Sequence, residues 1–466
     1  MCLLRQLSVI HADYEHFKIP PASIWVAGIG SIMFYLECMH TKFAALESQN
    51  QGKQSIMLIG LNMLEFSTAL LRPTLMEIDV SMNKIKELPV SVFQMPCLKI
   101  LRASSNRIYK VHASISKCDT LIELKLDHNE ITSIPASVGY LSKLQILRLE
   151  HNSIREVHAS FGLLLELTEL GLHANPIKRL PLELSGLHVK LTTLTLTSGS
   201  TWEIPTQSII SQGRAKILEF LQELSNGISK RSINLSNEEI SALYIDEPRF
   251  KSHLVQLNCA NNSIGFWPSG IFDCRQLESI NLRSNSIMSI PLDISQLKFL
   301  GLLDISYNSL SAIPDCIGTL TSLTSLLLEH NNVQTLPETL SSLHNLKVLN
   351  AAENKLAALF LGINKLLRLQ VLVLDLNEFI TIPDELFELF SLEELWVAGN
   401  KISYISAEIS MLKRLRIAQL TSNRLMSIPS EISHCEILEE LLFSGNLVSI
   451  IPTQIGLCLR LTRLEY

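Results

Sequence analysis

The chain of 466 residues lacks the short motifs that usually mark an enzyme or a cofactor site. It has no Gly-x-x-x-x-Gly-Lys phosphate loop, no His-Glu-x-x-His zinc motif and no Cys-x-x-Cys pair. Catalysis would also need a pocket in which reactive groups converge. The sequence therefore predicts no enzymatic activity, no cofactor, and no catalytic, cofactor-binding or metal-ligating residues.

Neither basic nor acidic residues are in large excess. Lys and Arg number 39 against 45 Asp and Glu, which leaves a formal net charge of −6. A nucleic-acid partner usually requires a basic surface, and an acidic tail requires a run of acids. We therefore expect protein partners and no nucleic acid.

Long hydrophobic runs are also missing, although 47% of the residues are apolar. One candidate extends from Ala22 to Leu36 and is interrupted by Gly28 and Gly30. A membrane-spanning helix needs about 20 apolar residues, and a secretory signal places its apolar stretch closer to the start of the chain. The sequence predicts no membrane span, and a targeting role for this segment is left open.

Asparagine, by contrast, recurs with a fixed period. It returns every 23 residues in two blocks, at Asn83, Asn106, Asn129, Asn152 and Asn175, and at Asn262, Asn285, Asn308, Asn331, Asn354, Asn377, Asn400, Asn423 and Asn446. Each asparagine ends the same unit, for example Leu323-x-x-Leu326-x-Leu328-x-x-Asn331, which is followed by Pro337 and a second run of leucines. This unit is a leucine-rich repeat.

The repeat predicts an α/β fold. The leucines of its first half alternate as in a short strand, and those of its second half recur at helical steps, so one repeat makes one coil of a solenoid. We expect a curved horseshoe with a parallel β-sheet on its concave face and short helices or turns on its convex face. The asparagine amide should pair with buried backbone groups of adjacent coils, each of which would otherwise cost about 1–3 kcal/mol.

We interpret the chain as two consecutive arrays joined by a capping helix. The domains are an N-terminal extension (1–38), the first array (39–200), the capping helix and linker (201–231) and the second array (232–466). An apolar stripe between Gly213 and Leu224 predicts the helix. The second array ends in the strand pattern Leu461-x-x-Leu464-x-Tyr466 without a cap, which suggests a truncated C-terminal end.

Nine cysteines could mark a secreted disulfide framework, but their positions indicate otherwise. Four of them lie twelve residues after an asparagine, where other repeats have leucine: Cys118, Cys274, Cys435 and Cys458. In that place cysteine acts as a small buried hydrophobic residue, and a reducing compartment keeps it unpaired. We expect a cytoplasmic protein and leave a nuclear location open.

The segment between the arrays carries a more specific pattern, Ile209-x-x-x-Gly213-x-x-x-Ile217-Leu218-x-Phe220-Leu221. Together with the two arrays, it resembles the leucine-rich repeat-containing protein 40 family, from about Phe43 to the end of the chain. The repeats are also similar to those of Ras-pathway scaffolds and of plant intracellular Ras-group-related proteins. The chain departs from the first family at Gly199-Ser200-Thr201, where that family has Gly-Asn-Pro. The resemblance implies an intracellular, non-enzymatic binding protein.

Outward positions of successive strands should line up as columns on the concave face. In the first array, the position between the second and third leucines holds three successive cations, Arg102, Lys125 and Arg148. Glutamates stand two residues before this position in alternate repeats. The column is either a docking site for a charged protein surface or a solvated face with cross-strand ion pairs.

The same column becomes apolar in the second array. It holds Leu327, Val373, Trp396 and Leu442, and Tyr307 lies nearby. Exposed apolar patches often mark interaction sites, and a tryptophan at the centre of an interface commonly contributes about 2 kcal/mol or more. Trp396 is therefore the favoured anchor. The alternative is that another segment of the protein covers the patch.

Three functional hypotheses follow. The first is a scaffold or adaptor in signal transduction, which binds a protein partner on its concave face through Arg102, Lys125, Arg148, Tyr307, Leu327, Val373, Trp396 and Leu442. The second is a regulator of Ras-like small GTPase signalling, suggested only by the similarity of the repeats. The third is the recognition part of a larger enzyme, a kinase or a ubiquitin ligase, whose catalytic domain is missing. The oligomeric state is left open.

A metal site is a weaker idea. His128, His151 and His330 each precede a repeated asparagine, so a metal ion could bridge neighbouring coils. Tight binding needs ordered ligands with their own supporting hydrogen bonds, and the same position holds other residue types in other repeats. The sequence therefore predicts no metal.

Overall fold

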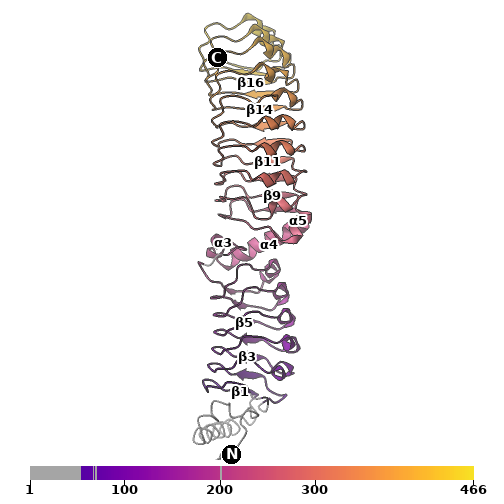
Figure 1. The fold of residues 1–466 in the computed structure, drawn as a ribbon, viewed down its shortest axis with the longest axis vertical. Helices are drawn as coiled ribbons and strands as arrows, with labels where there is room; N and C mark the ends of the chain where they lie inside the picture. Colours follow the sequence, from indigo (N-terminus) through magenta and orange to yellow (C-terminus); the bar gives the residue numbers. More distant parts are fainter. Residues whose placement is uncertain (1–53, 67, 69–70, 200–201) are drawn as a thin grey trace, which may run out of the picture. The chain divides into compact units, whose positions relative to one another are not determined.

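The computed structural model describes residues 54–66, 68, 71–199 and 202–466 (Figure 1). The N-terminal extension expected for residues 1–38, with the apolar run from Ala22 to Leu36, lies outside these residues. Within the described ranges, no helix is long and apolar enough to cross a membrane.

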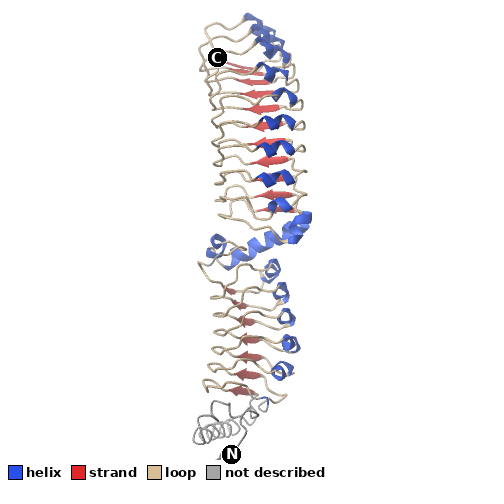
Figure 2. Ribbon diagram, viewed as in Figure 1, coloured by secondary structure: helices blue, strands red, loops and turns tan. Residues whose placement is uncertain are grey.

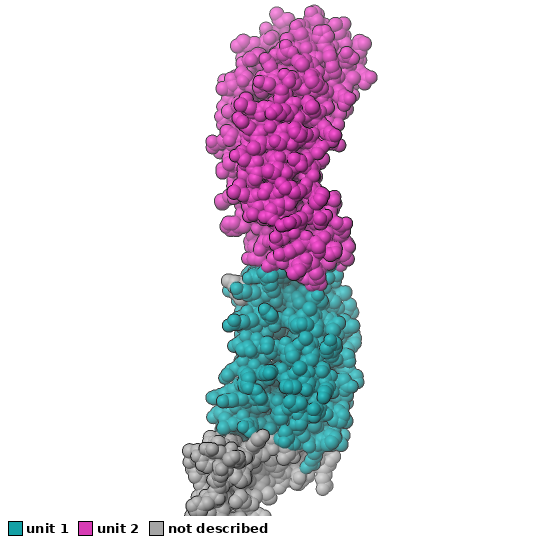
Figure 3. All heavy atoms as spheres, turned by 45° about the vertical axis from the view of Figure 1, so that its right-hand side comes forward, with its two compact units in different colours: residues 1–225 teal, residues 226–466 magenta. Residues whose placement is uncertain are grey.

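The chain divides into two compact units, residues 1–225 and 226–466 (Figure 3). Each unit is a stack of coils whose three-residue strands form one parallel sheet. Figure 2 shows the strands of each unit stacked in one column and the short helices in another. This is the predicted α/β leucine-rich repeat solenoid.

The first unit has a seven-stranded sheet in chain order. Its strands are β1 (Ser55–Met57), β2 (Glu77–Asp79), β3 (Ile100–Arg102), β4 (Glu123–Lys125), β5 (Ile146–Arg148), β6 (Glu169–Gly171) and β7 (Thr193–Thr195). Its 3-10 helices are η3 (Val90–Gln94), η4 (Ala113–Lys117), η5 (Ala136–Tyr140), η6 (Ala159–Leu163) and η7 (Leu182–Leu187). Two α-helices follow, α3 (Gln207–Ser211) and α4 (Arg214–Lys230).

The second unit has an eleven-stranded sheet, again in chain order. Its strands are β8 (Ser232–Asn234), β9 (Gln256–Asn258), β10 (Ser279–Asn281), β11 (Leu302–Asp304), β12 (Ser325–Leu327), β13 (Val348–Asn350), β14 (Val371–Val373), β15 (Glu394–Trp396), β16 (Ile417–Gln419), β17 (Glu440–Leu442) and β18 (Arg463–Glu465). Its helices are α5 (Pro248–His253), η8 (Ile271–Asp273), η9 (Leu292–Gln296), η10 (Asp315–Thr319), η11 (Glu338–Ser342), η12 (Ile363–Lys365), η13 (Asp384–Glu388), η14 (Ala407–Met411), η15 (Ser430–His434) and η16 (Thr453–Leu457).

Helix α4 contains most of the segment for which the sequence predicts a capping helix. The four apolar residues of the predicted stripe, Ile217, Leu218, Leu221 and Leu224, are at most 2% exposed. The boundary between the two units falls inside this helix. The apolar stripe is therefore the buried face of α4.

The proline of the repeat explains where the 3-10 helices begin. Pro337 precedes η11 with φ −72° and ψ 146°, an extended conformation that the proline ring favours. Pro89 and Pro291 take the same place before η3 and η9. Each proline thus ends the extended segment and leads the chain into the short helix.

The repeated asparagine binds backbone groups of two successive coils. In Asn331, Nδ2 donates to the carbonyl oxygen of Leu328 in its own coil and of Ile305 in the preceding coil, both at 3.0 Å. Its Oδ1 accepts from the N–H of Leu310 at 2.9 Å. Asn106 makes the same contacts in the first unit. The predicted role of the asparagine is confirmed, and the ladder satisfies polar groups that the stack buries.

The residue before the asparagine adopts a left-handed backbone. Its φ is 55° at Tyr307, 53° at His330 and 51° at Glu353. This conformation turns the chain sharply off the strand and is uncommon for residues other than glycine. The side chains at this position form a row along the edge of the sheet, which we call the rim.

The cysteines that replace leucine are in the core, as predicted. Cys118, Cys274 and Cys435 are 0% exposed and Cys458 is 7% exposed. All described cysteines are free thiols. Burial raises the pKa of the Cys118, Cys274 and Cys435 thiols to about 12, so these residues stay protonated and unreactive at neutral pH.

Candidate functional site

The strand register brings the predicted columns together within each unit. Arg102 pairs with Lys125, and Lys125 with Arg148, in strands β3 to β5. Val373 pairs with Trp396 in strands β14 and β15. Because alternate residues of a strand point to opposite sides, these side chains share the outward side of their sheet, which we call the strand face.

The cationic column of the first unit is neutralised within the sheet. The Arg102 guanidinium contacts Glu123 at 2.6 Å and Glu77 at 2.5 Å, and Lys125 contacts Glu123 at 3.0 Å. Arg148 contacts Glu169 at 2.5 Å. The hydrogen bond that Arg102 donates to Glu123 raises the pKa of Arg102, while burial acts in the opposite direction.

These contacts match one of the two alternatives that the sequence left open. The glutamates of one column bind the cations of the next, through cross-strand ion pairs of Arg102 and Arg148 and one pair within β4, Lys125 with Glu123. The paired side chains remain partly exposed, and such pairs contribute about 0–1 kcal/mol each. Arg102, Lys125 and Arg148 therefore present little unpaired positive charge to a partner.

Histidines line an open hollow of about 430 Å³ at the rim of the same unit. The rings of His128 and His151 stack at 4.2 Å between centroids, and His173 meets His151 edge-on at 5.6 Å. Asp127, Arg148, Glu150 and Thr195 complete its wall. Among the described residues, no group of three or more His, Cys, Asp or Glu side chains is arranged to hold a metal ion.

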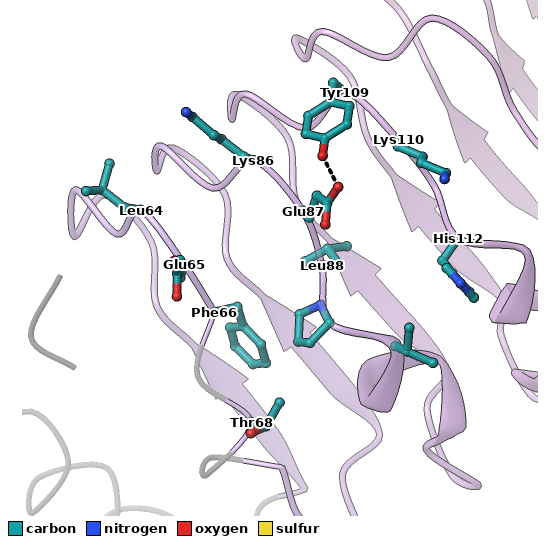
Figure 4. A pocket seen from close by; sticks show the side chains of 12 residues that line it. Leu64, Glu65, Phe66, Thr68, Lys86, Glu87, Leu88, Tyr109, Lys110 and His112 are labelled. Atoms are coloured by element: carbon teal, nitrogen blue, oxygen red, sulfur yellow. Dashed lines mark hydrogen bonds between the residues drawn. The ribbon is translucent and has the colours of Figure 1, made fainter. Parts of the chain in front are cut away.

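A larger hollow of about 770 Å³ lies among the loops of the first coils (Figure 4). The hydroxyl of Tyr109 donates to Glu87, and Lys86 and Lys110 extend on either side of this pair. Leu88, Pro89 and Val90 form part of its wall. The repeat pattern does not predict this hollow, because most of its wall comes from loop positions that vary from coil to coil, with Leu88 and Pro89 as the repeat positions among them.

The second unit carries the apolar part of the predicted surface. Leu327, Val373 and Trp396 are partly exposed on the strand face. The indole Nε1 of Trp396 donates to the Glu394 carboxylate in the same strand at 3.0 Å, which orients the ring. The backbone of β15 pairs with β14 and β16, so only side chains are offered to a partner at this point.

Leu442 does not contribute to this surface. It was expected as an exposed member, but it is only 3% exposed. The register places it between Gln419 and Glu465 of the adjacent strands. A place in the column determines which side of the sheet a residue faces, whereas the neighbouring side chains determine how much of it stays uncovered.

Tyr307 is also placed differently from an open apolar anchor. The Arg283 guanidinium lies 4.3 Å from the centre of its ring, and the His330 ring stacks on it at 4.7 Å. Its hydroxyl donates to Glu329 at 3.1 Å, and this hydrogen bond raises the pKa of Tyr307. His330 in turn contacts Glu353 at 2.7 Å. Tyr307 therefore belongs to a polar network along the rim.

One functional candidate was missed in the sequence. Asp375 follows Val373 by two residues on the outward side, and burial raises the pKa of its carboxyl to about 6 although the N–H of Ala398 lowers it. That N–H donates to Oδ1 at 2.6 Å. A usable signal was present, because alanines occupy the equivalent positions in both adjacent coils, Ala352 and Ala398.

Comparison with known proteins agrees with the repeat architecture. The family model described as leucine rich repeat matches residues 119–177 and 275–333. No protein with a curated description matches the chain.

Solved structures of repeat proteins resemble the chain along most of its length. A leucine-rich repeat protein of Leptospira interrogans is 23% identical, with a TM-score of 0.48, over 90% of this chain and 98% of that one. A plant peptide hormone receptor in complex with its peptide is 23% identical, with a TM-score of 0.46, over 85% and 67%. An internalin of Listeria monocytogenes is 16% identical, with a TM-score of 0.35, over 91% and 88%. At these identities and scores we draw no functional argument from the structures.

Proposed function

We propose that this protein is a non-enzymatic scaffold or adaptor inside the cell, which binds a protein partner on the strand face of its second unit. The observation that supports this most directly is Trp396, a partly exposed indole beside Val373 on a sheet whose backbone groups are already paired. A large aromatic side chain held in this way suits a binding hot spot, because little conformational freedom remains to be lost.

The two strand faces differ in what they offer a partner. The cations of the first unit are bound by glutamates of the same sheet, as described above. Around Trp396, the outward positions instead hold valines and isoleucine, namely Val348, Val371, Val373 and Ile417, all partly exposed. A partner gains more by covering this apolar surface than by competing for paired charges.

The buried free thiols fit a protein of a reducing compartment. Cys118, Cys259, Cys274 and Cys435 are fully buried free thiols, spread over both units. Proteins of the reducing cytoplasm and nucleus keep such thiols unpaired, whereas secreted proteins more often form disulfides. This supports an intracellular role.

The first prediction concerns Trp396→Ala. Proximity labelling in the protein's own cells should give a set of labelled proteins for the wild type, and part of that set should be lost with Trp396→Ala. A hot-spot tryptophan of about 2 kcal/mol corresponds to roughly a thirtyfold loss of affinity. Direct binding to nucleotide-loaded Ras-like GTPases, measured in parallel, tests one class of partner.

The matched control is Phe266→Ala. Phe266 is 85% exposed in the loop between β9 and η8, away from the strand face of the same unit. This variant should label the same proteins as the wild type. An unchanged set with Trp396→Ala, in protein whose melting curve shows that it is folded, would refute the proposed binding surface.

A further inference from the structure

The middle coils of the second unit present a strand face that is acidic as well as apolar, and Arg283 and Arg463 lie on the same face in the flanking coils. In each coil, four residues lie on this face or on the rim, namely those six, four, two and one positions before the asparagine. Over the described coils that end at Asn308 through Asn446, none of these positions holds lysine or arginine. The acids among them are Asp304, Glu329, Glu353, Asp375, Glu394 and Glu440.

Four of these carboxylates already have side-chain partners. Glu329 accepts from Tyr307 at 3.1 Å and pairs with Arg283 at 3.4 Å, and Glu394 accepts from the Trp396 indole at 3.0 Å. Glu353 contacts His330, and Glu440 contacts Arg463. Asp304 and Asp375 remain, and both bind backbone N–H groups.

Of these two aspartates, only Asp375 can be reached by a partner. Asp304 is 7% exposed, and its Oδ1 accepts from the N–H of Ser306 at 2.9 Å. Asp375 is partly exposed, and its Oδ1 accepts from the N–H of Ala398. In the part of the chain that the structure describes, no lysine or arginine side chain pairs with Asp375.

Asp375 lies within the apolar surface. Val373 precedes it by two residues on the same side of the strand, and Trp396 pairs in register with Val373. Ala398, which binds the carboxylate, follows Trp396 by two residues in the next coil. The carboxylate is therefore poorly hydrated, lies one coil from the strongest candidate anchor, and pairs with no lysine or arginine among the described residues.

On the basis of the proposed function, we propose that the strand face of the second unit binds a basic protein segment in which a lysine or arginine flanked by apolar residues pairs with Asp375. The apolar residues of that segment cover Val373 and Trp396. An acidic segment is disfavoured, because it would bring like charge to a face that already holds six carboxylates.

The unbound protein explains why such a pairing would be favourable. Much of the cost of removing water from Asp375 has already been met in folding, and one short hydrogen bond from a backbone N–H offsets only part of it. A cation from the partner forms a charge-assisted hydrogen bond at a site where screening by water is weak. The pairing therefore adds affinity and fixes the register of the segment on the sheet.

The experiment selects binders from a display library of random short peptides on the whole protein, and then measures their affinity for variants. Peptides that compete with one another on the wild type should be enriched in lysine or arginine next to apolar residues. Their affinity should fall by at least about thirtyfold with Asp375→Asn, which retains an oxygen for the Ala398 N–H but removes the charge. Trp396→Ala should weaken the same peptides.

Asp127→Asn is the matched control, because Asp127 lies in the first unit at the same position relative to its asparagine, Asn129. It should leave binding unchanged. Peptides that need Trp396 but show no basic enrichment, or that bind Asp375→Asn equally well, would overturn the basic-segment proposal and leave the proposed function in place. A selection that yields no peptide sensitive to Trp396→Ala would contradict both.

Discussion

The carboxylate of Asp375 is partly buried, and among the residues that the structure describes its one hydrogen bond comes from the backbone N–H of Ala398. Burial raises its pKa from 3.8 to about 6, so at pH 7 the folded protein holds a charge that the unfolded chain would hydrate better. Charged groups that lower stability are common at functional sites, where stability is traded for activity or binding. Its position beside Trp396 is consistent with a role in binding.

The stability of Asp375→Asn tests this directly. Because the folded pKa lies above the unfolded one, this carboxyl destabilises the fold above about pH 6, and the penalty disappears as pH falls toward 4. Asp375→Asn should raise the free energy of unfolding at pH 7 by up to about 3 kcal/mol. Urea denaturation of both proteins at several pH values measures the difference, which should shrink below pH 6. A variant that is less stable at pH 7 would show that the charge is well accommodated.

The repeated asparagine has the opposite effect on stability. Asn331→Ala would leave the carbonyl of Ile305 and the N–H of Leu310 without their side-chain partner. We expect a loss of at least about 2 kcal/mol, because buried unpaired polar groups cost about 1–3 kcal/mol each. Urea denaturation followed by circular dichroism measures it. Asn332→Ala, at the exposed neighbouring position, should stay within about 0.5 kcal/mol of the wild type.

A glycine in a 3-10 helix can allow the backbone of the next 3-10 helix to approach closely, as between η10 and η11. A Cβ added to Gly318 in η10 would lie 2.3 Å from the carbonyl oxygen of Thr339 in η11, which cannot move without shifting the backbone. Gly318→Ala should therefore destabilise the second unit by about 1–3 kcal/mol. Gly456 in η16 occupies the same place in its coil, but a Cβ there meets nothing within 4 Å.

The melting temperatures of the two alanine variants separate the cost of a steric clash from the preference of alanine for helical backbone. Gly456→Ala should be neutral or slightly stabilising, since alanine favours helical conformations more than glycine does. Equal melting temperatures for Gly318→Ala and Gly456→Ala would show that adjacent 3-10 helices can separate at little cost.

Sequence reasoning succeeded where the period of the repeat determines geometry. The pairing of Arg102 with Lys125 and of Val373 with Trp396 follows from a constant spacing, so their shared face could be predicted. It was less successful in predicting how exposed a side chain is and which other side chains it contacts. Leu442 is covered and Tyr307 is held by rings and a carboxylate, because neighbouring side chains from other coils decide these features.

At the scale of the whole chain, the asparagine period alone was sufficient to predict two parallel sheets of stacked coils. The signal for Asp375 is weaker, because it depends on small neighbours in two other coils and on which described side chains pair with its carboxylate. Repeats thus make the fold easy to read from sequence. The candidate binding residues are those that depart from the repeat, such as Asp375. Their exposure and pKa depend on contacts with neighbouring coils.

The asparagine ladder also bears on how such a chain can change its length over evolution. Each side-chain amide binds groups in its own coil and in the preceding one, at intervals of 23 residues. A duplication or deletion of one full period inside an array therefore leaves every internal amide with partners, wherever in the coil the break falls. The ladder also tolerates a change of one residue, because Asn83 binds the carbonyl of Leu58 across a coil one residue shorter, and Asn262 binds that of Leu235 across a coil one residue longer. Repeat number can therefore change by whole periods without leaving a buried amide unpaired.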